Sequence, residues 1–249
     1  MIAKTYDQYA TYNPSKLSDE ERFVSISQRE DRGEYDSAVW RRLAADNVDG
    51  VSWRGCVLNK SPIEIALYPM LIEELKPKTI FELGALNGGG ALWMTDIANI
   101  MGLSPTMISV DMDLKMLSPH VAKDSRIEFI EGDANAIETV FPASRLAELP
   151  HPWLIIEDCH VNTLGILDHF YNNGLSAGDY MIVEDTNQTL WDCWAQDWDS
   201  EAETCGQLKL DDLRAWCAKH PDMAVDTKYL DAFGYNASKN WNSVLVKRP

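Results

Sequence analysis

Five apolar runs between residues 79 and 186 each have an acidic residue at or next to their end, and helical segments separate several of them. The runs are TIFEL, MISVD, EFIEGD, WLIIED and YMIVED, and the last two end in the pairs Glu157–Asp158 and Glu184–Asp185. Short apolar runs alternating with amphipathic helices are typical of parallel strands wrapped by helices. Ligands of such sheets bind beyond the carboxyl ends of the strands. The acids therefore predict a binding site.

The pattern predicts an α/β fold, a Rossmann-like doubly wound sheet of seven strands. Five strands are expected to be parallel, and the runs VDTKYL (225–230) and NSVLVK (242–247) to form an antiparallel C-terminal hairpin. Residues 1–50 differ in character. They predict a helical arm without a strand, with helices capped by Ser18 and Asp36, that acts as a lid or an oligomer contact. Residues 51–249 are predicted to form the catalytic domain.

The chain is strongly acidic, with 39 acidic and 22 basic residues and a net charge of -17. This charge disfavours nucleic acid and anionic membrane partners and favours a small molecule or a cation. Five cysteines form no CxxC pair, and the N-terminal residues do not resemble a secretion signal. We therefore expect reduced thiols and a cytoplasmic protein. No apolar run approaches the roughly 18 residues of a membrane span, and the helical arm favours a homo-oligomer.

A glycine-rich stretch, FELGALNGGGALW, follows the first apolar run. Gly84 comes directly after the strand, and Gly88 begins a run of three glycines at the start of the next helix. Glycines there allow the backbone to approach a ligand closely, although a helix that packs near a strand also favours them. No Lys-Ser/Thr follows, so the loop is not a P-loop, and the GxGxxG spacing of dinucleotide sites is absent. An NAD-dependent oxidoreductase is therefore disfavoured.

Two acids on the next strands suit an adenosine ligand. Asp111 ends the second strand, where a carboxylate can accept hydrogen bonds from both ribose hydroxyls. Asp133 ends the third and can accept from an exocyclic adenine amine, although alone it reads as an ordinary turn residue. The order of the glycine loop and these two acids favours an adenosine ligand that carries no phosphate.

From residue 60 onward the chain resembles the class I S-adenosylmethionine-dependent methyltransferases. The motifs SWRGCVLNKSP, FELGALNGGGALW, ISVDMD, IEFIEGDA, GDYMIVEDTN and YNASKNWNSVLVK are similar to the metal-dependent, cephalosporin-hydroxylase-like branch, which includes sugar and antibiotic O-methyltransferases. The resemblance implies S-adenosylmethionine and Mg²⁺, or another hard divalent cation, as cofactors. The cofactor-binding residues that we expect are Glu82, Gly84, Ala85, Asn87, Gly88, Asp111, Asp133 and Ala134.

The same resemblance implies that Asp158, Glu184 and Asp185 hold the metal. A hard divalent cation would cancel the repulsion among these neighbouring carboxylates. Glu157 is the alternative to Asp158, and because successive strand residues point to opposite faces, only one of the two should reach the metal. We favour Asp158, which the resemblance also places among the catalytic residues.

His160 is the second predicted catalytic residue, because it lies close enough to the metal acids to act as a general base. The alternative, a histidine that caps a helix or hydrogen-bonds a carboxylate, is equally open. Trp191, Trp194 and Trp198 are spaced along one helical face and predict either core packing or a wall for an aromatic or bulky substrate.

The function expected from this resemblance is Mg-dependent O-methylation of a small-molecule hydroxyl in secondary metabolism. Three alternatives stay open. The chain could bind the cofactor and catalyse an elimination or cyclisation, assist a hydroxylation as an auxiliary protein, or methylate nitrogen or carbon.

Overall fold

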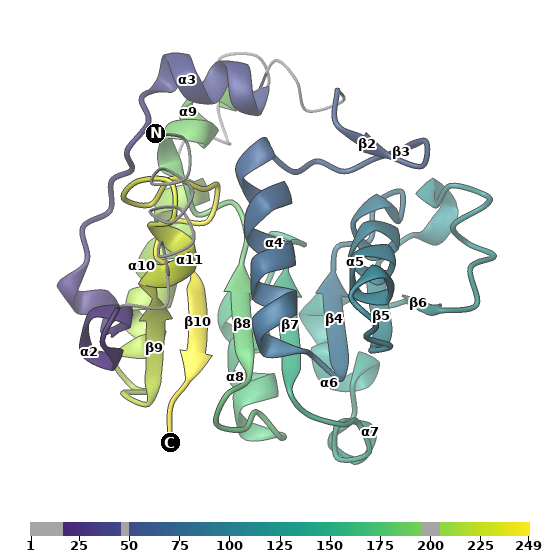
Figure 1. Ribbon diagram of the computed structural model, residues 1–249. Coiled ribbons are helices and arrows are strands. Elements are labelled where there is room, and N and C mark those ends of the chain that lie inside the picture. The colour runs from purple at the N-terminus through teal and green to yellow at the C-terminus, as the bar shows by residue number, and fades with distance from the viewer. Residues whose placement is uncertain (1–16, 46–49, 196–204) are drawn as a thin grey trace, which may run out of the picture.

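A single eight-stranded sheet organises the molecule (Figure 1). The computed structural model describes residues 17–45, 50–195 and 205–249. In sheet order the strands are β1 (Phe23–Val24), β9 (Met223–Asp226), β10 (Val244–Lys247), β8 (Tyr180–Val183), β7 (Trp153–Glu157), β4 (Thr79–Leu83), β5 (Thr106–Asp111) and β6 (Ile127–Glu131). The last five named are parallel to one another, and β10 is antiparallel to both β8 and β9. The predicted Rossmann-like fold is confirmed.

Helices cover both faces of the sheet. In Figure 1, α4 (Pro62–Leu75) and α5 (Gly89–Ile100) lie in front of it, and α6 (Ile137–Val140) and α8 (Thr163–Asn172) lie behind it. The other α-helices are α2 (Asp19–Arg22), α3 (Ser37–Leu43), α7 (Ala143–Leu146), α9 (Gln188–Ala195), α10 (Cys205–Cys217) and α11 (Thr227–Leu230), and short 3-10 turns cover Ile26–Gln28, Leu114–Met116 and Ala134–Ala136. Every residue of β4, β7 and β8 is buried, as expected for strands covered on both faces.

Three details of the predicted topology are wrong. The N-terminal arm does contain a strand, because β1 pairs with β9 and raises the strand count from seven to eight. The run 225–230 is not all strand, since β9 ends at Asp226, whose carboxylate caps the helical turn α11. A further two-stranded sheet joins β2 (Ser52–Trp53) to β3 (Cys56–Val57). Short, two-residue strands carry too little periodicity to be seen in a sequence.

The arm is fixed to the domain by a partly buried ion pair. Arg22 Nη2 lies 2.7 Å from Oδ2 of Asp226, whose side chain is fully buried. The predicted caps are confirmed: Ser18 accepts from the backbone of Glu21 in α2, and Asp36 accepts from Val39 in α3. Among the described residues, no helix is both long and apolar enough to span a membrane.

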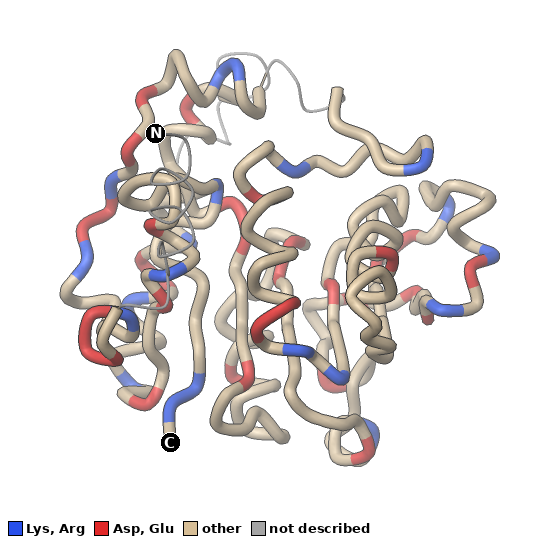
Figure 2. Tube along the Cα trace, viewed as in Figure 1, with Lys and Arg blue, Asp and Glu red and all other residues tan. Residues whose placement is uncertain are grey.

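The strand order reverses between β4 and β7. From β4 the chain continues outward to β5 and β6, and then crosses back to β7 and β8 on the other side. This reversal leaves a crevice beyond the carboxyl ends of the strands, the usual ligand site of such sheets. Figure 2 shows acidic segments at the upper ends of the central strands, which is this edge of the sheet.

Candidate active site

A cavity of about 450 Å³ opens at the carboxyl ends of the parallel strands. This volume lies within the usual range for small-molecule sites. Seven of the eight residues predicted to bind the cofactor line it: Glu82, Gly84, Ala85, Asn87, Asp111, Asp133 and Ala134. Gly88 does not line the cavity. It caps α5 with a φ of 80°, and a Cβ there would lie 2.7 Å from a methyl group of Val121.

Gly84 joins the glycine loop to the acidic strand ends. Its φ is 110°, and a Cβ at this position would lie 2.4 Å from the carbonyl oxygen of Asp158. Only glycine tolerates both the backbone conformation and the contact. The loop at the end of β4 therefore packs directly against the end of β7, so that the predicted cofactor and metal regions belong to one cavity.

The two acids predicted to bind adenosine accept hydrogen bonds from nearby backbone. Asp111 Oδ2 accepts from the Leu86 amide at 2.8 Å, and Asp133 Oδ1 accepts from the Asn135 amide at 2.8 Å. Asp111 is partly exposed and Asp133 is exposed, and neither forms an ion pair with any residue that the structure describes. Their remaining oxygen lone pairs face a cavity where a ligand with hydroxyl or amine donors could bind.

Glu82 differs from these acids because it is buried. Its exposed fraction is 3%, and the hydroxyl of Ser109 donates to Oε2 at 2.5 Å. Burial raises the pKa of the Glu82 carboxyl to about 8, although the hydrogen bond from Ser109 acts in the opposite direction. Glu82 is thus mainly neutral at pH 7.

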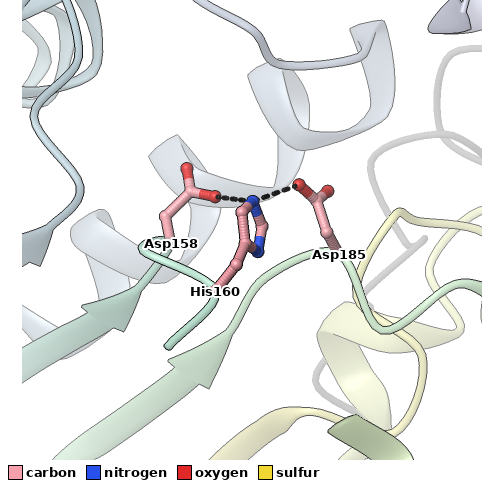
Figure 3. A group of neighbouring side chains, drawn as sticks. All are labelled: Asp158, His160 and Asp185. Carbon is pink, nitrogen blue, oxygen red and sulfur yellow. Dashed lines mark ion pairs between the residues drawn. The ribbon is translucent and has the colours of Figure 1, made fainter. Parts of the chain in front are cut away.

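Asp158, His160 and Asp185 come together at the ends of β7 and β8 (Figure 3). His160 lies between the two acids, with Nε2 3.9 Å from Asp158 Oδ1 and 3.7 Å from Asp185 Oδ2. One ligand atom from each residue lies within 4.8 Å of the others, as a metal site requires. His160 and Asp185 both have left-handed backbone, with φ of 57° and 59°. Non-glycine residues in this conformation are uncommon and are often found at functional sites.

Glu184, the third predicted metal ligand, is not part of this group. Its side chain is fully buried, Tyr68 donates its hydroxyl hydrogen bond to Oε1, and the Lys60 ammonium donates to Oε2 at 2.5 Å. Burial and the negative charge of Asp158 raise the pKa of Glu184 to about 7. Asp158 and Asp185 thus face the cavity, while both oxygens of Glu184 are occupied by side chains from the segment around the start of α4.

Two buried lysines balance the charge of the three acids. Lys60 Nζ also donates to Asp158 Oδ2 at 2.9 Å, and Lys239 Nζ lies 2.7 Å from Asp185 Oδ1. Burial disfavours each ammonium, but the carboxylates outweigh it and hold the pKa of both lysines above the usual range. The contact of Lys239 with Asp185 lacks hydrogen-bond geometry, which leaves that buried carboxylate oxygen without a hydrogen-bond donor.

A third lysine, Lys209, fixes the orientation of His160. Its ammonium contacts Glu157 Oε2 at 3.0 Å, His160 Nδ1 at 2.9 Å and the Glu184 carbonyl oxygen at 2.9 Å. A lysine ammonium only donates, so Nδ1 must accept, and neutral His160 then carries its proton on Nε2. Glu157, held by Lys209, does not line the cavity. This arrangement favours Asp158 over Glu157 as the residue that faces a ligand.

The tryptophans of α9 have both of the roles that the sequence left open. Trp191 and Trp194 are buried members of the core, and both also line the cavity. The Trp191 indole donates to the backbone oxygen of Asp185 at 2.6 Å, and the ring of His160 packs edge-on against it at 5.5 Å. Trp198 lies outside the described residues.

Sequence reasoning did not assign Tyr68, Lys209 or Lys239 to the site, and it did not identify Lys60 as a partner of the acids. Lys60 lies 98 residues from Asp158 and 124 from Glu184 along the chain, so no local motif links them. The available signal was charge balance. Acids clustered at the ends of buried strands require nearby cations, and a lysine directly before a helix start, as in NKSP, can supply one.

Comparisons with known proteins identify the family of this chain. The family model for rhamnosyl O-methyltransferase/CmcI matches residues 46–243. A rhamnosyl O-methyltransferase of Mycobacterium leprae is 29% identical over 66% of this chain and 69% of its own length. The Mycobacterium tuberculosis protein of the same name is 26% identical over 61% of this chain and 60% of its own length. The chain thus matches about two thirds or less of these relatives.

Solved structures of CmcI are similar over almost the whole chain. A CmcI structure with Mg and SAM has a TM-score of 0.64 and 28% identity, and covers 96% of this chain and 90% of that one. A CmcI structure with SAH has a TM-score of 0.62 and 27% identity. Because the family model spans most of its length, the chain belongs to the rhamnosyl O-methyltransferase/CmcI family and is an S-adenosylmethionine-dependent methyltransferase.

Proposed function

We propose that this chain transfers the methyl group of S-adenosylmethionine to a hydroxyl of a small molecule, at a site that also binds Mg²⁺ or another hard divalent cation. One observation carries the proposal. A single cavity joins the glycine loop and the strand-end acids Asp111 and Asp133 to the carboxylates Asp158 and Asp185. The family membership and the CmcI structure with Mg and SAM support it.

The donor set suits a hard cation. Asp158 and Asp185 offer carboxylate oxygens to the same point, and the buried Asp185 Oδ1 has no hydrogen-bond donor among the described residues. Oxygen ligands are those that magnesium prefers. We propose Asp158, Glu184 and Asp185 as its ligands, with Glu184 turning from Lys60 and Tyr68 toward the cavity. A bound divalent cation would lower the pKa of an acceptor hydroxyl and orient it.

The residues of the chain would then position the reactants. The glycine loop would allow the cofactor to approach the end of β4, where Gly84 packs against the backbone of Asp158. When bound, the cofactor would supply its sulfonium methyl group to the acceptor oxygen and would leave as S-adenosylhomocysteine. The hydroxyl proton needs an acceptor. His160 could take it at Nε2 only in the tautomer that carries its hydrogen on Nδ1, which requires the contact with Lys209 to open.

The acceptor is proposed to be a hydroxylated ring. Trp191 and Trp194 supply flat apolar walls beside the acids, which suits a sugar face or an aromatic ring. The names of the mycobacterial relatives support a sugar. We also propose that the chain acts in the cytoplasm, as part of secondary metabolism.

A methyl-transfer assay tests the function. Purified protein, S-adenosylmethionine and Mg²⁺ are incubated with rhamnosyl glycosides and with hydroxylated aromatic compounds, and products are identified by mass spectrometry. The proposal predicts a methylated hydroxyl that disappears with chelator and in Glu184→Ala. Methylation that persists in both would remove the metal from the mechanism. Cofactor turnover with no methylated product would favour a non-methylating reaction.

We also propose a homo-oligomer to which residues 1–50 contribute, as an arm that is attached through β1 to the catalytic domain of residues 51–249. The family match begins at residue 46, which is consistent with this division. Deleting the arm would be a poor test, because it removes β1 and leaves the buried Asp226 without Arg22. The mass of the full chain in solution, measured by light scattering after size exclusion, is the direct test, and a monomer would contradict the proposal.

A further inference from the structure

Lys60 occupies the position between two of the proposed metal ligands. Its ammonium is 2.9 Å from Asp158 Oδ2 and 2.5 Å from Glu184 Oε2, and the residue is only 5% exposed. It lies directly before Ser61, the N-cap of α4, where a capping box with Glu64 and the proline at the first helical position fix the backbone. Any movement of the Lys60 ammonium must therefore come from rotation of the lysine side chain.

A divalent cation and the Lys60 ammonium cannot both use these oxygens well. Magnesium binds oxygen ligands at roughly 2.0–2.1 Å, and a metal bound by both carboxylates would lie close to an ammonium that contacts the same two groups. Two cations at this separation in a buried site repel strongly. Metal binding by both Asp158 and Glu184 therefore requires Lys60 to withdraw from at least one of them.

We propose that Lys60 is a built-in competitor of the metal. In the metal-free protein it neutralises Asp158 and Glu184 and holds Glu184 away from the cavity, and it weakens the affinity of the site for divalent cations. This inference rests on the proposed function, since it assumes the metal site. The inference assigns a further role to Lys60, as a positioning residue. Lys60 stabilises the acid cluster in the absence of metal and determines how tightly the metal binds.

Lys239 does not have the same role. It approaches Asp185 without hydrogen-bond geometry, and its ammonium donates to the backbone oxygen of Asn59 at 3.0 Å. Its nearest distance to Glu184 is 3.9 Å. Lys239 is thus anchored by backbone beside one ligand, whereas Lys60 bridges two.

Calorimetric titration of Mn²⁺ and Mg²⁺ into the chelator-treated protein tests the proposal. The variants are Lys60→Met, which removes the charge and the hydrogen-bond donor, and Lys60→Gln, which removes the charge but keeps a donor. Tyr68→Phe is the matched control, because it removes the other hydrogen bond of Glu184 and leaves the charge unchanged. We expect both Lys60 variants to bind at least about tenfold more tightly than the wild type, and Tyr68→Phe to stay within about threefold. Equal or weaker binding by the Lys60 variants would overturn the proposal.

Thermal melting gives a second readout that does not depend on activity. In EDTA the Lys60 variants should melt below the wild type, because buried acids lose their partner, and Mg²⁺ should raise their Tm more than that of the wild type. Equal shifts would contradict the competition. Asp158→Asn distinguishes a failure of the proposed metal site from a failure of the competition by Lys60. If no protein binds metal, the proposed metal site and the competition both fail. If the wild type and the Lys60 variants bind equally and Asp158→Asn does not bind, only the competition fails.

Discussion

The carboxylates in the two halves of the cavity differ in their burial and in their ion pairing. On the side of β5 and β6, Asp111 and Asp133 are at least partly exposed, accept hydrogen bonds from backbone amides a short distance away, and have no ion-pair partner among the described residues. On the side of β7 and β8, Asp158, Glu184 and Asp185 are more deeply buried and are balanced by Lys60 and Lys239, which come from distant parts of the chain.

This difference indicates what each half binds. Exposed carboxylates with free lone pairs suit a ligand that donates hydrogen bonds, such as the hydroxyls and amine of adenosine. Buried carboxylates cannot remain charged without a positive partner, so that half must always contain cations. We therefore expect that substitutions in one half can impair cofactor binding or metal binding without impairing the other.

The largest expected effect is on the half with the lysines. Asp158→Asn removes one proposed metal ligand, and we expect kcat/KM for methyl transfer to fall roughly 10³-fold, because several kcal/mol of transition-state stabilisation are lost. Binding of S-adenosylhomocysteine, measured by calorimetry, should change less than about threefold. Loss of cofactor binding in this variant would show that the two halves are not separate.

The reciprocal change comes next in size. Asp111→Asn keeps the shape of the side chain but removes its charge, and hydrogen bonds to a charged acceptor are worth about 1.5–3 kcal/mol. We expect affinity for S-adenosylhomocysteine to fall roughly 10- to 100-fold. Mn²⁺ affinity should match that of the wild type, and a comparable loss of metal binding would contradict the division.

Substitution of Glu82, which lies between the two halves, should give the smallest effect. It should appear as a change in how the free energy of unfolding depends on pH. The Glu82 pKa of about 8 is raised by burial above the ordinary value, so the folded protein holds a proton that the unfolded chain releases. Its contribution to stability is full below the ordinary glutamate pKa and is lost as the pH rises toward 8. Glu82→Gln cannot lose that proton. The free energy of unfolding of Glu82→Gln minus that of the wild type should therefore increase by at least about 1.4 kcal/mol as the pH rises from 5 to 8. This amount is the equivalent of one pKa unit.

Denaturant unfolding of both proteins across this pH range measures the difference. Circular dichroism at each pH verifies that both start from the same fold. Parallel pH profiles for the wild type and Glu82→Gln would mean that Glu82 is ionised in the folded protein.

The parallel part of the fold was predictable because its elements are long and regular. The strand TIFEL is buried along its whole length, and α4 begins at Ser61 and Pro62, which are strong start signals. The two-residue strand β1 was missed because Phe23 and Val24 become a strand only by pairing with β9, a contact between distant segments. Residues 227–230 were read as the continuation of a strand, whereas β9 ends at Asp226, which caps the helical turn α11.

The site was predictable to the same degree. Gly84, Asp111 and Asp133 occur in local patterns that directly follow strands, and the structure brings them to one cavity. The acids of the other half were visible for the same reason. Their partners were not, because Lys60, Lys209 and Lys239 reach the acids from three separate segments, and only the folded chain places them there.

The most direct test of the central claim is a crystal structure with S-adenosylhomocysteine and Mn²⁺, in which anomalous scattering locates the metal. The account predicts the cofactor on the side of Asp111 and Asp133, and a manganese peak bound by Asp158, Glu184 and Asp185, with Lys60 withdrawn from at least one carboxylate. The account would be contradicted by cofactor in place with no metal peak among these acids, and Lys60 still bridging Asp158 and Glu184.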